Sequence, residues 1–378
     1  MPVPFRFEIA ENGRDVVGFF FEGNQKIAST SGRFENGALT LEYDFMNTVL
    51  EASVEGDQLR GTYRNRRPNS RPLEFHATRF APAAAAARST PRVDGEWAMY
   101  RTAADNSKLD VSWRLHLQQS GSEVSGAILK TSGDSGTLVG RWQDGRLIMS
   151  HFAGDRPLVF EARLNPDGTL SVTLDQKFTY RAARNAELGA KGIPEPPDLS
   201  RFTGVKNPRE PFHFSGSDLD GKLVSDADER FRGRVVVLTI GGTWCPNCRD
   251  EAPALTALYR EFHARGLEIV GLFFENDADL RVARPRVLSF ITRYGVPYPI
   301  LVAGATSEAV EKLPQLVNFS VYPTTIVLGR DGQARSVHAG FSSAATGGAH
   351  AQLLREQREL VERLLGEKVQ SRGQAGSK

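Results

Sequence analysis

Two cysteines, Cys245 and Cys248, constrain this chain more than any other feature, because they are its only cysteines and only two residues separate them. The run 234–240 before them is apolar and rich in β-branched residues, which predicts a strand buried on both faces. Leu255 and Leu258 after them follow helical spacing. A strand therefore passes into a helix at the cysteines, and a Cys-x-x-Cys pair at such a turn is typical of a redox-active site.

Length and charge exclude some classes of protein. The 378 residues predict two or three domains, and a net charge of +2 gives no reason to expect nucleic acid as a partner. No apolar run approaches the roughly 20 residues that span a bilayer, and no basic-then-apolar leader begins at Met1. We therefore expect neither an integral membrane segment nor a signal peptide within this sequence.

The first half of the chain repeats itself at an offset of 108 residues, which places Gly32-Arg33-Phe34 on Gly140-Arg141-Trp142. Such a constant offset indicates two tandem copies of one module. Apolar and polar residues alternate in each copy, and turn signals such as Asn36-Gly37 and Asp144-Gly145 separate the runs. The pattern predicts two tandem antiparallel all-β modules, each a small barrel or sandwich.

Two stretches of biased composition predict linkers between the domains. Residues 81–92 are rich in alanine and bounded by proline, and residues 185–210 contain Pro194, Pro196 and Pro197. The second copy opens with the apparent strand 93–100, whose counterpart would precede Met1. We therefore expect a natural precursor to supply that strand and an export leader. The expected boundaries are 1–80 and 93–184 for the modules, 211–368 for a third domain and 369–378 for a disordered tail.

The third domain alternates strands and helices, which predicts an α/β fold. Its apolar runs are bounded by glycine and proline turns, and Phe212–Phe214 is an extended entry or strand. The other predicted strands are 235–240, 267–274, 300–302, 324–328 and 334–339, and the predicted helices are 245–265, 287–294 and 349–365.

The third domain resembles the TlpA/ResA-like thiol-disulfide oxidoreductases of the thioredoxin superfamily. The resemblance covers about residues 211–368 and rests on two motifs. These are Trp244-Cys245-Pro246-Asn247-Cys248-x-x-Glu251-x-Pro253 and Val321-Tyr322-Pro323-Thr324. It implies a mixed sheet flanked by helices and a redox disulfide that faces a proline with a cis peptide bond.

The resemblance also implies a role for each cysteine. Cys245 would be the exposed nucleophile at a helix N-terminus, and Cys248 would resolve the mixed disulfide. The helix terminus favours a thiolate by only about 0.3–2 kcal/mol, so hydrogen bonds must supply the rest of any large pKa shift. The Pro-Asn dipeptide between the cysteines leaves the direction of the reaction open, while the resemblance favours a reductant.

Further site residues follow from the same resemblance. Glu251 would modulate proton transfer, although an acid in the first turns of a helix is also favourable without any catalytic role. Trp244 would shield the sulfur, and Tyr322, Pro323 and Thr324 would border a bound substrate strand. The predicted substrate-binding residues are thus Trp244, Tyr322, Pro323 and Thr324.

Three other interpretations of these residues are a zinc site, a calcium loop and a thiol peroxidase, and the sequence favours none of these. Zinc normally takes four ligands, and no second Cys-x-x-Cys or paired histidines accompany the cysteines, so we expect no metal and no other cofactor. The acidic stretch 275–279 lacks a calcium-loop pattern and is predicted to be a surface loop. A thiol peroxidase is an alternative function, but its usual Pro-x-x-x-Thr-x-x-Cys pattern is absent.

The expected partners are protein thiols or disulfides and an upstream redox donor, in an extracytoplasmic compartment inferred from the resemblance. A second alternative is a binding or scaffold protein in which the β modules act and the redox domain is accessory. The sequence leaves open whether these modules dock a partner, dimerise or position the redox domain.

Overall fold

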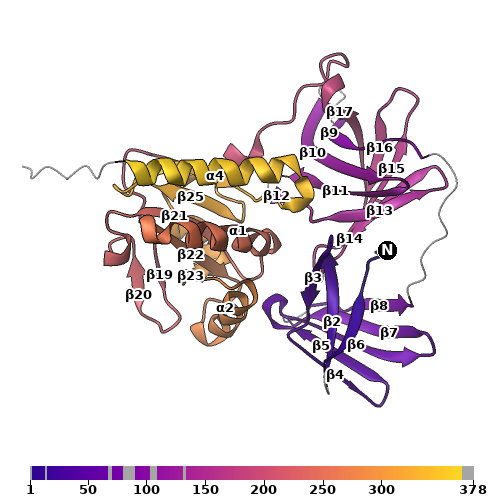
Figure 1. Ribbon diagram of the computed structural model, residues 1–378, viewed down its shortest axis with the longest axis horizontal. Coiled ribbons are helices and arrows are strands. Elements are labelled where there is room, and N and C mark those ends of the chain that lie inside the picture. Colours follow the sequence, from indigo (N-terminus) through magenta and orange to yellow (C-terminus); the bar gives the residue numbers. More distant parts are fainter. Residues whose placement is uncertain are drawn as a thin grey trace, which may run out of the picture. The chain divides into compact units, whose positions relative to one another are not determined.

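The computed structural model describes residues 2–12, 15–66, 70–79, 90–102, 109–130 and 133–367 (Figure 1). Most of the predicted linker 81–92 and the whole predicted tail 369–378 lie outside these ranges. Contacts divide the chain into two units. The first, which we call the β unit, comprises Met1–Lys130, Asp134–Asp198 and Ser342–Gly347, and the second, the redox unit, comprises Thr131–Gly133, Leu199–Phe341 and Gly348–Lys378.

Part of the β unit is a closed antiparallel barrel. Its ring of eight strands runs β10-β9-β17-β16-β15-β14-β13-β11 and closes because β11 also pairs with β10, while the short β12 extends the sheet beside β11. Trp97, Leu115 and Phe160 are fully buried in its core, so side chains fill the interior. The strands are β9 (Gly95–Thr102), β10 (Leu109–Ser120), β11 (Glu123–Lys130), β12 (Gly133–Asp134), β13 (Leu138–Gln143), β14 (Arg146–His151), β15 (Leu158–Leu164), β16 (Leu170–Leu174) and β17 (Phe178–Arg184).

The residues before the barrel form two further antiparallel sheets, β1-β2-β3 and β4-β5-β6-β7-β8. Their side chains share one core, to which Phe152 from the segment after β14 contributes. The Tyr63 hydroxyl in that core donates a hydrogen bond to the Gly154 carbonyl (2.6 Å). The strands are β1 (Glu8–Asn12), β2 (Asp15–Glu22), β3 (Gln25–Ala28), β4 (Ser31–Glu35), β5 (Ala38–Tyr43), β6 (Thr48–Glu55), β7 (Gln58–Asn65) and β8 (Leu73–Thr78).

Two matched hairpins follow the turn signals of the sequence. Asn36 and Gly37 join β4 to β5, and Asp144 and Gly145 join β13 to β14. All four residues have positive φ (50°, 80°, 48° and 73°), as a two-residue type I′ turn requires. Short loops therefore set the register of both hairpins.

The redox unit contains a seven-stranded mixed sheet in the order β20-β19-β23-β22-β21-β25-β26. Strands β21, β22 and β23 are parallel, and β25 and β26 continue the sheet antiparallel. The strands are β19 (Ser215–Ser217), β20 (Leu223–Ser225), β21 (Val235–Gly241), β22 (Leu267–Glu275), β23 (Ile300–Ala305), β25 (Thr324–Leu328) and β26 (Ala334–Ala339). A separate two-stranded sheet pairs β18 (Gly204–Val205) with β24 (Leu316–Val317).

Alternation along β21 explains how the sheet is covered on both faces. Val235 and Val237 pack with α1, α2 and α4, and Val236 and Leu238 pack on the opposite face with α3. Every residue of β21 is buried, as the apolar run predicts. The helices are α1 (Pro246–Phe262), α2 (Leu280–Tyr294), α3 (Ala309–Lys312) and α4 (Gly348–Gly366).

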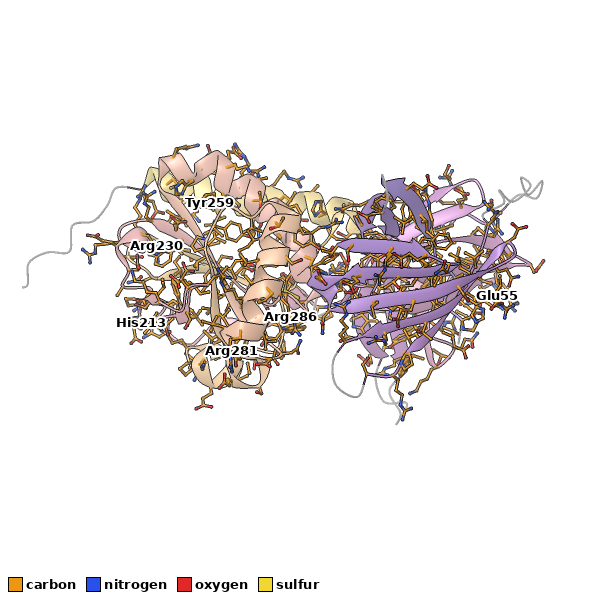
Figure 2. The ribbon with its side chains drawn as sticks, turned by 90° about the horizontal axis from the view of Figure 1, so that it is seen from below. Glu55, His213, Arg230, Tyr259, Arg281 and Arg286 are labelled. Carbon is orange, nitrogen blue, oxygen red and sulfur yellow. A yellow bond between two sulfur atoms is a disulfide. The ribbon has the colours of Figure 1, made fainter. Side chains whose placement is uncertain are left out.

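The predicted fold class is confirmed: the first half is all-β and the second half is an α/β thioredoxin-like domain. Of the two alternatives for Phe212–Phe214, the strand is wrong, because β19 begins at Ser215. Phe212 and Phe214 pack in the core beside this strand. Helix α2 begins at Leu280, seven residues before the predicted start. Asp279 caps this end of the helix, because its side chain accepts a hydrogen bond from the backbone N–H of Arg281. Arg281 is labelled in Figure 2. No described helix has the length and apolarity that a membrane span requires.

Candidate functional site

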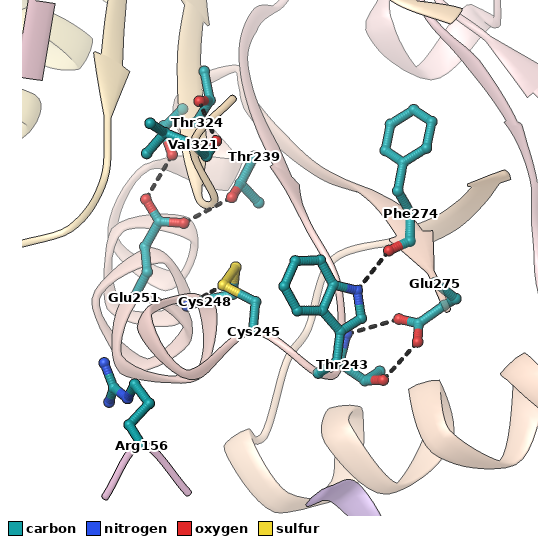
Figure 3. The surroundings of a disulfide bond; sticks show 12 residues. Arg156, Thr239, Thr243, Cys245, Cys248, Glu251, Phe274, Glu275, Val321 and Thr324 are labelled. Carbon is teal, nitrogen blue, oxygen red and sulfur yellow. Dashed lines mark hydrogen bonds between the residues drawn. A yellow bond between two sulfur atoms is a disulfide. The ribbon is translucent and has the colours of Figure 1, made fainter. Parts of the chain in front are cut away.

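The cysteine pair lies where β21 passes into α1 (Figure 3). Cys245 is the N-cap of α1, and Pro246 occupies the first turn, where its missing N–H leaves no helical hydrogen bond unmade. The two cysteines form a disulfide, and the backbone N–H of Cys248 donates to Cys245 Sγ (3.2 Å). The Cys245 sulfur therefore occupies an anion-favouring position at a helix N-terminus.

Both sulfur-bearing residues are buried in this disulfide form. Cys245 is 2% exposed and Cys248 is 4% exposed. The family resemblance implied an exposed first cysteine, and this is wrong for the disulfide form, in which Cys245 is buried.

Glu251 lies one turn further along α1 and is 2% exposed. Its carboxylate accepts hydrogen bonds from the hydroxyls of Thr239 on β21 (2.7 Å) and Thr325 on β25 (2.5 Å). Burial raises the pKa of Glu251 to about 7, against the lowering effect of the two hydroxyls. The structure thus provides an acid inside the domain that changes protonation near neutral pH.

Aromatic rings form a row beside the disulfide loop. Trp244 contacts Tyr322 at 5.2 Å between ring centroids, and Tyr322 contacts Phe319 at the same distance. The indole N–H of Trp244 donates to the Phe274 carbonyl (2.8 Å), which fixes the ring against the end of β22. This row gives the neighbourhood of the cysteines an apolar border.

The loop before β25 completes the predicted constellation. The Tyr322–Pro323 peptide bond is cis, and Ile240 of β21 lies opposite Thr324 across the sheet. Thr324 is fully buried, and its hydroxyl donates to the Val321 carbonyl (2.7 Å), so this side chain holds its own loop. Its contact with a substrate stays a prediction.

Comparison with known proteins bears on the redox unit. The Redoxin family model matches residues 201–353. The thiol-disulfide oxidoreductase ResA of Halalkalibacterium halodurans is 30% identical over 149 residues, which cover 39% of this chain and 73% of that protein. The chain belongs to the ResA family of thiol-disulfide oxidoreductases.

Two further matches each cover less than half of this chain. ResA of Bacillus subtilis (strain 168) is 28% identical over 128 residues, covering 34% of this chain and 64% of that protein. The chain thus spans about two thirds of the length of this curated relative. A solved thiol:disulfide interchange protein from Chlorobium tepidum TLS is 24% identical, with 43% of this chain and 100% of that chain covered and a TM-score of 0.33.

Sequence reasoning missed a second buried glutamate of the site, Glu275. We predicted that residues 275–279 form a surface loop, and this is wrong for Glu275, which is 0% exposed. Its carboxylate accepts two hydrogen bonds from Thr243, one from the backbone N–H and one from the hydroxyl (2.7 Å each; Figure 3). The only signal in the sequence is an acid that directly ends an apolar strand, LFFE.

Close approach of neighbouring atoms explains why the residue before Thr243, Gly242, is a glycine. A Cβ atom on Gly242 would overlap Trp244 Nε1 and lie 2.8 Å from the Phe274 carbonyl oxygen. The end of β22 therefore holds Thr243 and Trp244 directly before the N-cap cysteine, and Glu275 positions the reactive loop through its two hydrogen bonds to Thr243.

We expect Glu275→Ala to lower both the stability and the rate of disulfide exchange. The variant leaves two buried Thr243 donors unsatisfied, at about 1–3 kcal/mol each. Glu275→Gln is the matched control, since its amide can accept from the N–H and donate to the hydroxyl. Thermal unfolding and the alkylation rate of the reduced cysteines measure both effects, and equal values for Glu275→Ala and the unaltered chain would contradict the positioning role.

No three His, Cys, Asp or Glu side chains converge on a possible metal position within the described ranges.

Proposed function

We propose that the chain is a thiol-disulfide oxidoreductase that exchanges with protein disulfides through a mixed disulfide on Cys245. The observation that carries the proposal is the Cys245–Cys248 disulfide at the N-terminus of α1, with the Cys248 N–H directed at Cys245 Sγ. That donor and the helix terminus favour a thiolate on Cys245 once the disulfide is reduced.

The reaction balances in two exchanges. The Cys245 thiolate attacks one sulfur of a substrate disulfide, a new S–S bond forms, and the other substrate sulfur leaves as a thiolate. Cys248 then loses its proton and attacks Cys245 Sγ, which releases the second substrate thiolate and restores the Cys245–Cys248 disulfide. The substrate gains two electrons, and an upstream dithiol donor must return them to the chain.

Glu251 and the aromatic row take supporting roles in this proposal. With a pKa of about 7, Glu251 can accept a proton within the domain when Cys248 becomes a nucleophile. Trp244, Tyr322 and Pro323 border the cysteines, and we propose that an extended substrate segment lies along them, with Thr324 holding the loop.

Trapping tests the mixed disulfide. We expect reduced Cys248→Ala to form a stable adduct with a disulfide-containing protein, linked through Cys245, because the resolving sulfur is missing. Peptide mass mapping under non-reducing conditions identifies the bond. An adduct-free Cys248→Ala chain that still lowers the substrate's disulfide content would argue against this mechanism.

We further propose that the chain acts as a reductant. The expected reduction potential of the Cys245–Cys248 pair is near that of thioredoxin, about −270 mV, rather than the roughly −120 mV of a strong oxidant. Equilibration with a glutathione or dithiothreitol buffer, followed by alkylation, measures it. A value above about −150 mV would assign the chain to disulfide formation instead.

We propose an extracytoplasmic site of action on the basis of family membership. Protein disulfides persist in oxidising compartments and are rare in the reducing cytosol, so the substrates of such an enzyme lie outside the cytosol. Labelling of intact producing cells with a membrane-impermeant thiol reagent tests this, and labelling only after lysis would contradict it.

A further inference from the structure

Strand β18 and the residues that lead into it lie against the loop that precedes the cis proline. The strand pairs antiparallel with β24, where Gly204 lies opposite Val317. One residue beyond Val317, the side-chain amide of Asn318 donates a hydrogen bond to the carbonyl of Phe202 (3.3 Å). The Thr203 hydroxyl donates in turn to the Asn318 carbonyl (3.4 Å). The backbone of Phe202 is therefore held beside this loop.

The two strands have a buried side and an exposed side. Thr203 is 2% exposed and Leu316 is 7% exposed, whereas Phe202 is 46% exposed and Val317 is 36% exposed. Side chains at alternate positions of an extended chain share a face, so Phe202 lies on the face of Gly204 and Val317. A Cβ atom on Gly204 would lie 3.2 Å from Val317 Cγ2, so the glycine leaves that flank of the valine uncovered. We call Phe202 and Val317 the β18–β24 patch.

The β18–β24 patch continues the aromatic row that begins at the disulfide. Trp244 directly precedes the N-cap cysteine, its ring contacts Tyr322, and Tyr322 contacts Phe319, with 5.2 Å between ring centroids at each step. Phe319 directly follows Asn318, to which the carbonyl of Phe202 is bonded. Two such steps extend at most about 10 Å from the Trp244 ring, which an extended chain spans in roughly three residues.

Resting on the proposed function, we propose that the β18–β24 patch binds an apolar or aromatic side chain of the protein substrate. This side chain lies roughly three to four residues from the substrate cysteine that reacts with Cys245. Every disulfide substrate must reach the turn between β21 and α1, so a segment that extends from there along the aromatic row also covers the patch. Phe202 and Val317 are then specificity-determining residues for disulfide exchange.

The size of the β18–β24 patch defines what it can do. Two exposed side chains offer far less area than the roughly 1,200 Å² of a stable protein interface, so the patch does not hold a partner alone. It discriminates between segments that the reacting disulfide has already brought close. An aromatic side chain leaves water against Phe202, and a serine in its place gains nothing there.

Two model peptides test this discrimination with the reduced full chain. Both consist of serine and glycine around one cysteine, which carries 2-nitro-5-thiobenzoate in a disulfide. One of them also has phenylalanine on each side, roughly three to four residues from the cysteine. We expect the phenylalanine peptide to react at least about fivefold faster at low peptide concentration, because its ring is buried against the patch. The absorbance of the released thiolate measures both rates.

Protein variants locate the discrimination. Phe202→Ser is expected to slow the phenylalanine peptide at least about fivefold and to leave the rate of the serine peptide unchanged. Val317→Ser should reduce the preference as well, and Phe202→Leu should keep most of it. Leu223→Ser is the matched control, since Leu223 is an exposed apolar residue (70%) on β20, at an edge of the seven-stranded sheet. It should behave as the unaltered chain does.

The outcomes separate this proposal from the proposed function. Equal rates of the unaltered chain with both peptides would overturn the role of the β18–β24 patch and leave the redox activity intact. A preference that survives both Phe202→Ser and Val317→Ser would also overturn it, and so would an equal loss of rate with both peptides in these variants. If the unaltered chain releases no thiolate from either peptide, the proposed function itself fails, and this proposal fails with it.

Discussion

Replacing Cys245 with serine is expected to lower the rate of catalysed disulfide exchange by at least about a thousandfold. A serine hydroxyl cannot form a disulfide with a substrate, and it is far less ionised at neutral pH than a thiol. The N–H of Cys248 would then face an oxygen that carries no negative charge. The measurement is the reduction of a protein disulfide by a trace of the chain in excess of a small thiol.

Cys248→Ser is the matched control for this experiment. It removes the second sulfur from the same helical turn but leaves Cys245 able to attack once. We expect a single turnover that ends in a mixed disulfide, whereas Cys245→Ser should show none. If Cys245→Ser keeps more than about a tenth of the activity, the nucleophile lies elsewhere and the assignment of roles is wrong.

Local pattern was enough to predict the strands that build the redox unit. Residues 324–328 and 334–339 are strands with the predicted bounds, and 235–240 and 267–274 are each one residue short of the observed strands. Three of these runs are mostly apolar and form fully buried strands, whereas 334–339 mixes polar and apolar residues and is only partly buried.

Closure of the sheets could not be predicted in the same way. A period of two shows which face of a strand is buried, but not which strands are neighbours, so barrel and sandwich stayed open for the first half. Glu275 was missed for a related reason: its partner, Thr243, is 32 positions away in the sequence. A hydrogen-bonded pair such as Thr243 and Glu275, near the ends of two neighbouring strands, leaves no local pattern in the sequence.

Glu251 gives the second large expected effect, on stability. Its pKa is raised from an ordinary value of 4.5 to about 7, so the folded chain holds this proton at pH 5–7 while the unfolded chain has released it. Stability is therefore greatest below pH 4.5 as far as this group is concerned, and it falls as the pH rises to 7. The shift of roughly 2.5 units corresponds to about 3 kcal/mol lost between those limits.

Glu251→Gln is expected to remove this loss, so that the variant is more stable than the unaltered chain by up to about 3 kcal/mol at pH 8 and nearly equal to it at pH 5. Glutamine resembles the protonated acid: its carbonyl can accept from one threonine hydroxyl and its amide can donate to the other. Calorimetry from pH 5 to pH 8 measures the difference in stability. The unfolding transition to compare is the one whose midpoint temperature shifts when the Cys245–Cys248 disulfide is reduced.

A surface change on the same helix separates burial from net charge. Glu261→Gln also removes one carboxylate from α1, but Glu261 is exposed and pairs with Arg358 (2.6 Å) at the surface. Such a pair contributes about 0–1 kcal/mol, so this variant should keep the pH dependence of the unaltered chain. If both variants follow the same curve, or if Glu251→Gln loses stability at pH 8, the Glu251 carboxyl is ionised in the folded chain at little cost. With a pKa near its ordinary value, it would be only a weak base for the proton of Cys248.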